Sequence, residues 1–263
     1  MRLRFIGALL LATLPSVGLL PATAQVAGSA AIPRARDGKP NLSGIWQVMN
    51  AAAWDIQDHS AQKGIPAGQG VVEGNEIPYQ PWALAKKKAN GENRATLDPE
   101  GHCYLPGVPR ATYMPFPFQI VQVPDMVTIL YEYVHATRYI YTNGSRHREG
   151  QVDLWMGDSR GRWEGDTLSV DVTHFNDQTW FDRSGNFHSD ALHEIERYTL
   201  LDRDHINYAV TIEDPKVFTR PWTMNMILYR HTEKNFQLLD YECYGFDFEP
   251  YYPYPELAKG APR

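Results

Sequence analysis

The stretch Arg162-Trp-Glu-Gly-Asp-Thr-Leu-Ser-Val-Asp-Val-Thr173 decides the fold that the sequence predicts. Its Glu-Gly-Asp centre is typical of a tight turn between two antiparallel strands. After the turn, apolar residues alternate with polar ones at Leu168, Val170 and Val172, which is the period of a strand with one buried face. The stretch therefore predicts a β-hairpin whose second strand lies against an apolar interior.

Similar β-rich segments recur on both sides of this hairpin. They are residues 41–47, 126–133, 135–141, 193–201, 206–212, 222–230 and 236–241. Short polar turns separate most of them, as at 202–205 and 232–235. Seven or more strands joined one after another in this way indicate a mainly β protein. We expect an antiparallel meander, either closed as a barrel or folded as a sandwich.

The remaining segments lack this alternation. Pro81–Asn90 is predicted as one short helix, because proline favours the first turn of a helix and Asn90-Gly91 ends it. Residues 58–78 read as an irregular loop, and the five prolines of 98–118 indicate an extended connection. We divide the chain into a signal peptide at 1–24, a disordered lead-in at 25–40, a single β-barrel domain at 41–245 and a Pro/Tyr-rich C-terminal tail at 246–263.

The first 24 residues have the pattern of a secretory signal peptide. Arg2 and Arg4 precede an apolar run, and Ala22 and Ala24 form the small-residue pattern that signal peptidase accepts. Gln25 is then the first residue of the mature protein. No later segment is apolar enough to span a bilayer. We therefore expect a periplasmic or secreted protein without a membrane span.

The charge of the mature chain limits its partners. Cleavage removes two of the 25 basic residues and none of the 31 acidic ones, so the net charge is 23 − 31, or about −8. This excess of acidic groups disfavours nucleic acids and anionic membrane surfaces as partners. A small molecule is the expected ligand or substrate, and the sequence leaves the oligomeric state open.

The chain contains two cysteines, Cys103 and Cys243. In an oxidising compartment an even number of cysteines favours a disulfide, here a structural one because neither residue lies in a C-x-x-C motif. The alternative is two unrelated buried thiols.

Two motifs resemble known families. Gly44-Ile-Trp46 resembles the G-x-W opening strand of lipocalin-like (calycin) barrels. The longer motif Gly157-Asp-Ser-Arg-Gly-Arg-Trp-Glu-Gly-Asp-Thr-Leu168, with His188-Ser189, Leu192-His193 and Asp214-Pro215, is similar to a family of secreted bacterial proteins of unassigned function. This resemblance covers most of 37–243. It implies a periplasmic, lipocalin-like barrel and carries no activity with it.

Three predicted strands carry their apolar face into a titratable residue near the strand end. These residues are His135, His174 and Asp214. Polar groups at the mouth of a barrel, beneath aromatic walls, are a common way to build a ligand pocket. The alternative is that each strand end emerges into water, where histidine and aspartate are ordinary.

Metal, serine-hydrolase and nucleotide chemistry find little support in the motifs. His193 and Glu196 are three residues apart and so face opposite sides of a strand, and no H-E-x-x-H spacing is present. The serine between the glycines of 157–161 is followed by another strand rather than by a helix, unlike a nucleophile elbow. No phosphate-binding glycine loop appears, so we expect neither a metal nor a cofactor.

The first hypothesis is a cofactor-independent lyase, isomerase or hydrolase that acts by acid–base chemistry on a small organic or glycosidic molecule. Its proton-handling groups would be His135, His188, His193 and Asp214. Its substrate-binding groups would be Tyr133, Arg138, Trp180, Asp182 and Trp222. The alternatives are a lipocalin-like protein that binds a small molecule without catalysis, and an envelope scaffold whose barrel is filled by side chains.

Overall fold

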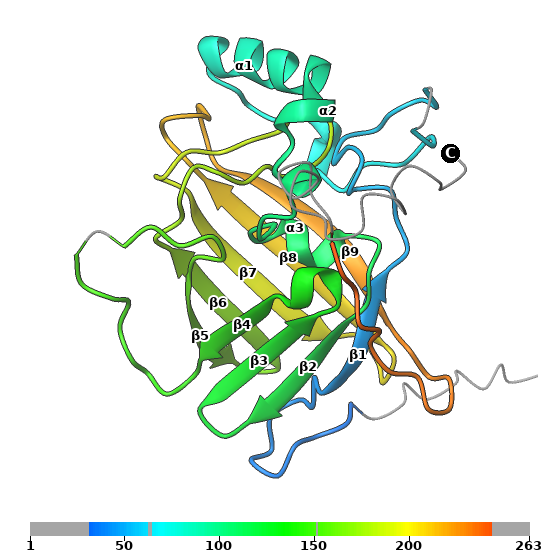
Figure 1. Cartoon of the computed structure of the whole chain (residues 1–263). Coiled ribbons are helices and arrows are strands. Elements are labelled where there is room, and N and C mark those ends of the chain that lie inside the picture. Colours follow the sequence, from blue (N-terminus) through cyan, green and yellow to red (C-terminus); the bar gives the residue numbers. More distant parts are fainter. Residues whose placement is uncertain (1–31, 63–64, 151, 244–263) are drawn as a thin grey trace, which may run out of the picture.

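The computed structural model describes residues 32–62, 65–150 and 152–243, and within these ranges nine strands close a barrel (Figure 1). The strands follow the chain order around the barrel. They are β1 Gly44–Val48, β2 Phe118–Val123, β3 Met126–Tyr131, β4 Thr137–Tyr141, β5 Asp158–Glu164, β6 Thr167–Thr173, β7 His193–Leu200, β8 His205–Glu213 and β9 Trp222–Arg230. The mainly β fold and its closure as a barrel are confirmed.

One pair of neighbouring strands departs from the predicted antiparallel meander. β4 and β5 run parallel and pair only at Ile140↔Ser159 and Tyr141↔Arg160, whereas the other neighbours are antiparallel. Strands that alternate in direction around a closed ring must be even in number. Nine strands therefore require at least one parallel pair.

The predicted hairpins are present, but the last predicted strand is wrong. β5 and β6 turn at Gly165, and β7 and β8 form a ladder of eight paired positions. Residues 236–241 form no strand. The reason is that β9 already pairs with β8 on one side and with β1 on the other, so the closed barrel leaves no edge for a further strand.

Short helices gather at one end of the barrel, which we call the helix end. β1, β3, β6 and β8 finish there, and α1 and α2 lie beyond it in Figure 1. The predicted helix is confirmed as α1, Pro81–Glu92. The other helices are α2 Arg94–Leu97, α3 Arg110–Tyr113 and the 3-10 turns η1 Glu73–Asn75, η2 Pro99–His102 and η3 Tyr133–His135.

The connection at 98–118 is folded and not extended. Its η2 and α3 are held together by Arg110, which is buried and forms ion pairs with Asp98 at 2.8 Å and with Glu100 at 2.8 Å. A buried guanidinium needs such carboxylate partners to offset its lost hydration. The prolines of this segment thus lie in a compact structure over the helix end. We call residues 98–118 the plug.

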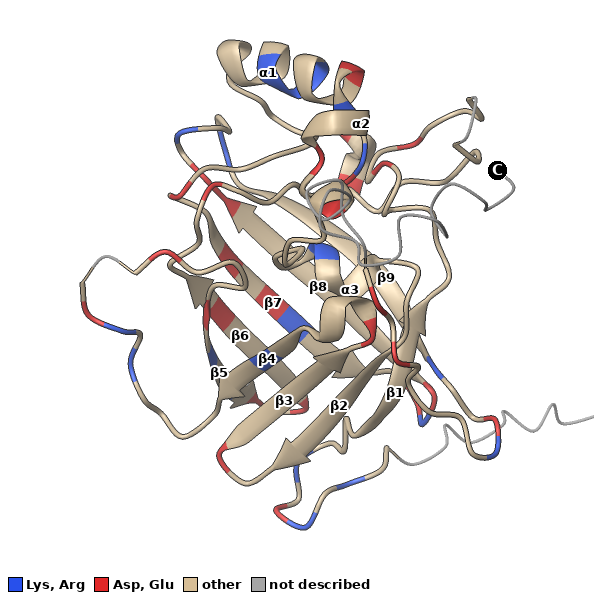
Figure 2. Ribbon diagram, in the orientation of Figure 1, with Lys and Arg blue, Asp and Glu red and all other residues tan. Residues whose placement is uncertain are grey.

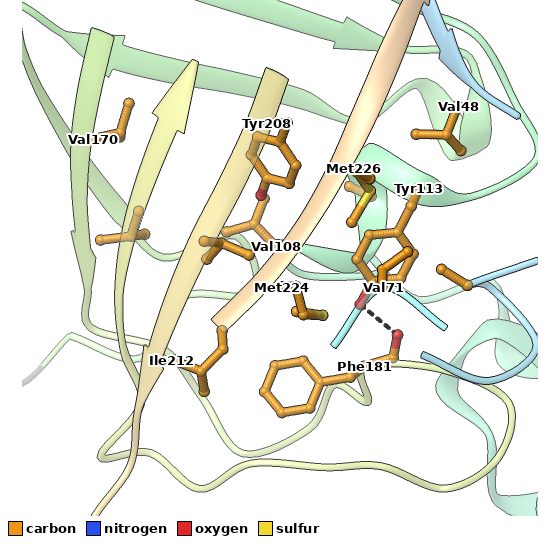
Figure 3. Close-up of a cluster of buried hydrophobic side chains, with 14 of the residues drawn as sticks. Val48, Val71, Val108, Tyr113, Val170, Phe181, Tyr208, Ile212, Met224 and Met226 are labelled. Atoms are coloured by element: carbon orange, nitrogen blue, oxygen red, sulfur yellow. Dashed lines mark hydrogen bonds between the residues drawn. The ribbon is translucent and has the colours of Figure 1, made fainter. Parts of the chain in front are cut away.

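This plug fills the helix end of the barrel with side chains. Tyr113 of α3 donates a hydrogen bond to the Phe181 carbonyl oxygen at 2.7 Å, and Phe181 packs edge-on against Trp222 at 5.7 Å between ring centroids. Figure 3 shows Tyr113 and Phe181 among apolar side chains of β8 and β9. Trp222, which is expected to line an open mouth, is thus packed against the residues at the helix end.

The outer parts of the chain were predicted with mixed success. Residues 32–40, assigned to a disordered lead-in, form a bridge between Arg34 and Pro40, and Arg34 pairs with Asp166 at 2.6 Å. The expected signal peptide at 1–24 and tail at 246–263 lie outside the described residues. Within the described ranges, none of the helices has the length and apolar character needed to cross a membrane.

A disulfide joins Cys103, directly after η2, to Cys243, beyond β9. The two Cα atoms are 5.7 Å apart, although 140 positions separate the residues in sequence. The predicted disulfide is confirmed, and it ties the plug to the chain that follows the last strand.

Replacing both cysteines, as Cys103→Ser with Cys243→Ser, should lower the free energy of unfolding by up to about 5 kcal/mol. The cross-link removes conformational entropy from an unfolded loop of this length. Urea denaturation of the wild type, the variant and the reduced wild type measures the effect. The variant and the reduced wild type should agree, and a variant as stable as the oxidised protein would contradict the expectation.

Candidate functional site

The interior of the barrel contains a buried polar cluster around Arg138 and Glu196. Arg138 of β4 forms a two-pronged ion pair with Glu196 of β7, and its Nε donates to Ser159 Oγ at 3.0 Å. Tyr208 and Tyr198 donate to Glu196 Oε1 at 2.6 and 3.2 Å. Both charged side chains are almost completely buried. Arg138, predicted to bind substrate, is thus held by a partner within the barrel.

Glu194 lies two residues before Glu196 and faces the same interior. It is fully buried, and neither of its carboxylate oxygens has a hydrogen-bond partner among the described residues. Burial, together with the nearby Glu196 carboxylate, raises the pKa of Glu194 well above its usual range. The fold therefore favours the protonated, neutral form of Glu194.

Two of the predicted site residues, His188 and Asp214, hold the loops near the plug in place. His188 is buried, its Nδ1 faces the Ser189 carbonyl at 2.9 Å, and its Nε2 faces the Thr179 hydroxyl at 2.6 Å. Burial lowers the pKa of His188 and favours the neutral ring. Asp214 accepts hydrogen bonds from the backbone and hydroxyl of Ser189 at 2.6 and 2.9 Å and from the backbone of Lys216 at 3.1 Å.

Asp182 and Trp180 belong to the same loop region. The buried Asp182 carboxylate accepts from the backbone of Ile56, Ser184 and Asn186 and from the Asn186 side chain. Trp180 pairs with Phe187 across a bridge and is 8% exposed. The polar groups of this segment thus order the loop itself and join it to Ile56.

The predicted residues near the end of β3 form a further group. The Tyr133 hydroxyl donates to the Glu100 carbonyl at 3.2 Å, and burial raises the pKa of Tyr133. His135 is half-exposed and pairs with Asp240 at 3.1 Å. His135, His188 and His193 therefore have different partners, whereas His188 and Asp214 are brought together through Ser189.

A second polar cluster lies on the outer face of β5–β8 at the helix end. Asp158, Asp171, His193 and Glu213 occupy the outward positions of β5, β6, β7 and β8, alternating with buried inward residues. The strand register brings them close together, since Asp158 pairs with Thr173 and His193 with Glu213, and Asp171 lies two positions before Thr173 on β6. Figure 2 shows acidic residues in red on β6 and β7; those of β7 are Glu194 and Glu196, which face inward and belong to the first cluster.

The long connection between β4 and β5 completes this cluster. It brings His147 between the carboxylates of Asp158 and Asp171. Further along, its Leu154 backbone pairs with the backbone of His174 and Asn176 at 2.9 Å each, which fixes the chain just beyond β6. His174 has a φ of 62°, a left-handed conformation that non-glycine residues adopt mainly at turns and functional sites.

Carboxylates and imidazoles alternate along this outer cluster. His147 Nδ1 is 3.0 Å from Asp158 Oδ2, and its Nε2 is 3.1 Å from Asp171 Oδ1. His193 Nε2 is 3.1 Å from the same Asp171 oxygen, and its Nδ1 is 3.2 Å from Glu213 Oε2. We call these five residues the imidazole–carboxylate row.

The row is rich in hydrogen-bond acceptors. A neutral imidazole has one N–H, so it can donate to only one of the two carboxylates that flank it. A cation held by the other ring nitrogen would suit such an arrangement. Arg160 adds one positive charge, 2.9 Å from Asp158 Oδ1.

Two hollows adjoin the row. The first, of about 290 Å³, is lined by His174, His193 and the apolar Val152, Phe175 and Leu192, among others. The second, of about 160 Å³, opens beside the parallel β4–β5 pair and is lined by residues that include Asp158, Ser159 and Arg138. The row is thus bordered by a hollow at His193 and by another at Asp158.

Sequence reasoning found His193 and His174 but missed the other members of this site. The sequence does show polar positions that alternate with apolar ones at Asp158, Asp171 and Glu213. These positions face outward, whereas a ligand pocket is expected on the inward face of a barrel. His147 had no signal, because its loop shows no apolar period. The expectation that no metal binds stays a prediction.

Comparison with known proteins adds no relative. No family model matches the chain, and no curated protein is found to be related to it. The site must therefore be interpreted from its own geometry.

The buried ion pair makes a stability prediction. Arg138→Met alone should lower the free energy of unfolding by about 3–5 kcal/mol, because it leaves Glu196 buried and unpaired. Combining it with Glu196→Gln should recover much of that loss, since the glutamine is neutral and still accepts from Tyr208. Urea denaturation of the two single variants and the double variant measures this coupling; losses that simply add would contradict it.

Glu194→Gln should change how stability depends on pH. Between the usual glutamate pKa of about 4.3 and its raised value in the fold, the folded protein keeps a proton that the unfolded chain releases, so wild-type stability falls as pH rises. The variant lacks this penalty. Its melting temperature relative to the wild type should increase from pH 4 to pH 8, while the exposed Glu73→Gln control should show no such trend.

Proposed function

We propose that this protein is an extracytoplasmic enzyme that uses acid–base catalysis on a small organic molecule. The observation that carries the proposal is the position of His193 at the edge of a hollow, with Asp171 and Glu213 on its two nitrogens. Histidine is the side chain best suited to move protons near neutral pH. The confirmed disulfide supports an oxidising compartment, as the leader sequence predicts.

The contacts of His193 suit it to proton transfer. The carboxylates of Asp171 and Glu213 contact the two ring nitrogens and orient the ring, as an acidic partner does for a catalytic histidine. A substrate that displaces the more exposed Glu213 carboxylate can exchange a proton with Nδ1, while Nε2 keeps its contact with Asp171. The side chain is 34% exposed, so a substrate can reach it.

The adjoining hollow indicates the size and character of the substrate. At about 290 Å³ it is at the small end of ligand pockets. Its apolar wall at Phe175 and Leu192 suits a carbon skeleton, while its Asp190 is already paired with Lys216 at 2.6 Å. The reaction class stays a lyase, isomerase or hydrolase, now assigned to the outer face of the barrel.

Turnover assays on a panel of small esters, glycosides and hydroxy acids test this proposal. His193→Gln should reduce kcat/KM on any accepted substrate by about 10²–10⁴-fold, the usual contribution of a general acid or base. His205→Gln is the matched control, because His205 is also an outward histidine paired with an aspartate, Asp202 at 2.8 Å, at the opposite end of β8. It should retain wild-type turnover.

Two results would count against the enzyme. Wild-type turnover in His193→Gln would remove His193 from the reaction. Thermal stabilisation of the wild type by members of the panel that are never converted would favour a binding protein, since a ligand stabilises the fold by mass action alone.

A further inference from the structure

We infer that His147, Asp158 and His174 bind a divalent transition-metal ion at the end of the row. One potential ligand atom from each residue lies within 4.8 Å of the other two. This inference goes beyond the proposed function, because the ion would bind whether or not the adjoining hollow converts a substrate.

Two of the three donor atoms already have the spacing of a coordination shell. Ligand bonds of about 2.0–2.1 Å place the donor atoms of a tetrahedral zinc site roughly 3.3 Å apart. His147 Nδ1 and Asp158 Oδ2 are already 3.0 Å apart. Because His174 and His147 are only partly buried, a small side-chain rotation can bring the third donor to the same spacing.

The residues around the three ligands provide the support that metal sites require. A metal-bound histidine usually donates its other N–H to a carboxylate or another oxygen, which fixes the ring. His147 has the Asp171 carboxylate at its Nε2, and His174 has the Thr173 hydroxyl 2.7 Å from its Nδ1. The Asp158 carboxylate is oriented by the Arg148 backbone N–H at 3.1 Å.

The charge of the cluster also favours a cation. Asp158 and Asp171 both approach His147, and a neutral imidazole can satisfy only one of them. A divalent ion on Nδ1 leaves the N–H of Nε2 for Asp171. Arg160 already pairs with Asp158 Oδ1, so the ion would use the other carboxylate oxygen, Oδ2, which lies beside His147 Nδ1.

The donor set indicates the class of ion and its accessibility. Two imidazoles and one carboxylate suit zinc, iron(II) or manganese(II) rather than calcium or magnesium, which prefer oxygen ligands. Three protein ligands leave at least one position for water or substrate, as in catalytic metal sites. His174 lines the larger hollow and Asp158 the smaller one, so this position is reachable from both.

Titration calorimetry of the untagged, chelator-treated chain with Zn²⁺ and Mn²⁺ tests the inference. One ion should bind per chain. His147→Ala and His174→Ala should each weaken that binding by at least 100-fold, and Asp171→Asn by about 10–100-fold as an outer-shell residue. His205→Ala should bind like the wild type, because its imidazole pairs with Asp202 away from this cluster.

Absorption of bound Co²⁺ gives a second readout, since its visible spectrum should change in His147→Ala and stay unchanged in His205→Ala. Circular dichroism of each variant checks that the barrel is folded. Wild-type affinity in both His147→Ala and His174→Ala, or the absence of one-to-one binding by the wild type, would overturn the metal site. His193→Gln separates the two proposals, because it should lose turnover and keep the ion.

Discussion

The closure of nine strands into one ring is the constraint on which the rest of the structure depends. An odd ring must contain a parallel pair, and here β4 and β5 form it. A parallel pair cannot be joined by a tight turn, because the chain must return along the barrel before the second strand begins. The connection at 142–157 makes this return (Figure 1). On its way it delivers His147 to the outer face of β5 and β6.

The sequence predicted the parts of this architecture that local patterns specify. The β5–β6 and β7–β8 hairpins were predicted because each joins alternating strands through a polar turn. The β4–β5 joint had no such signal, since two paired positions leave little pattern. Closure by β9 on β1 is a contact between distant segments, which is why residues 236–241 were wrongly predicted as another strand.

The candidate site overlaps the predicted residues at His193. The segment around His193 is rich in polar residues, and His193 does lie among carboxylates. At the helix end, where a mouth is expected, Tyr113 of α3 packs with Phe181. The plug could not be foreseen, because the 98–118 segment owes its shape to the buried Arg110 ion pairs and not to an apolar period.

The period of a β-strand explains how one element serves stability and chemistry at once. On β7, Glu194 and Glu196 face inward and His193 faces outward. The inward carboxylates are buried, so each charged one needs an ion pair or hydrogen bonds to offset its lost hydration. The outward imidazole borders a hollow, where the same strand gives it a rigid position. Because the sheet separates the two faces, the interior ion pair can link β4 to β7 while the proposed proton transfer and cation binding are both assigned to the outer row.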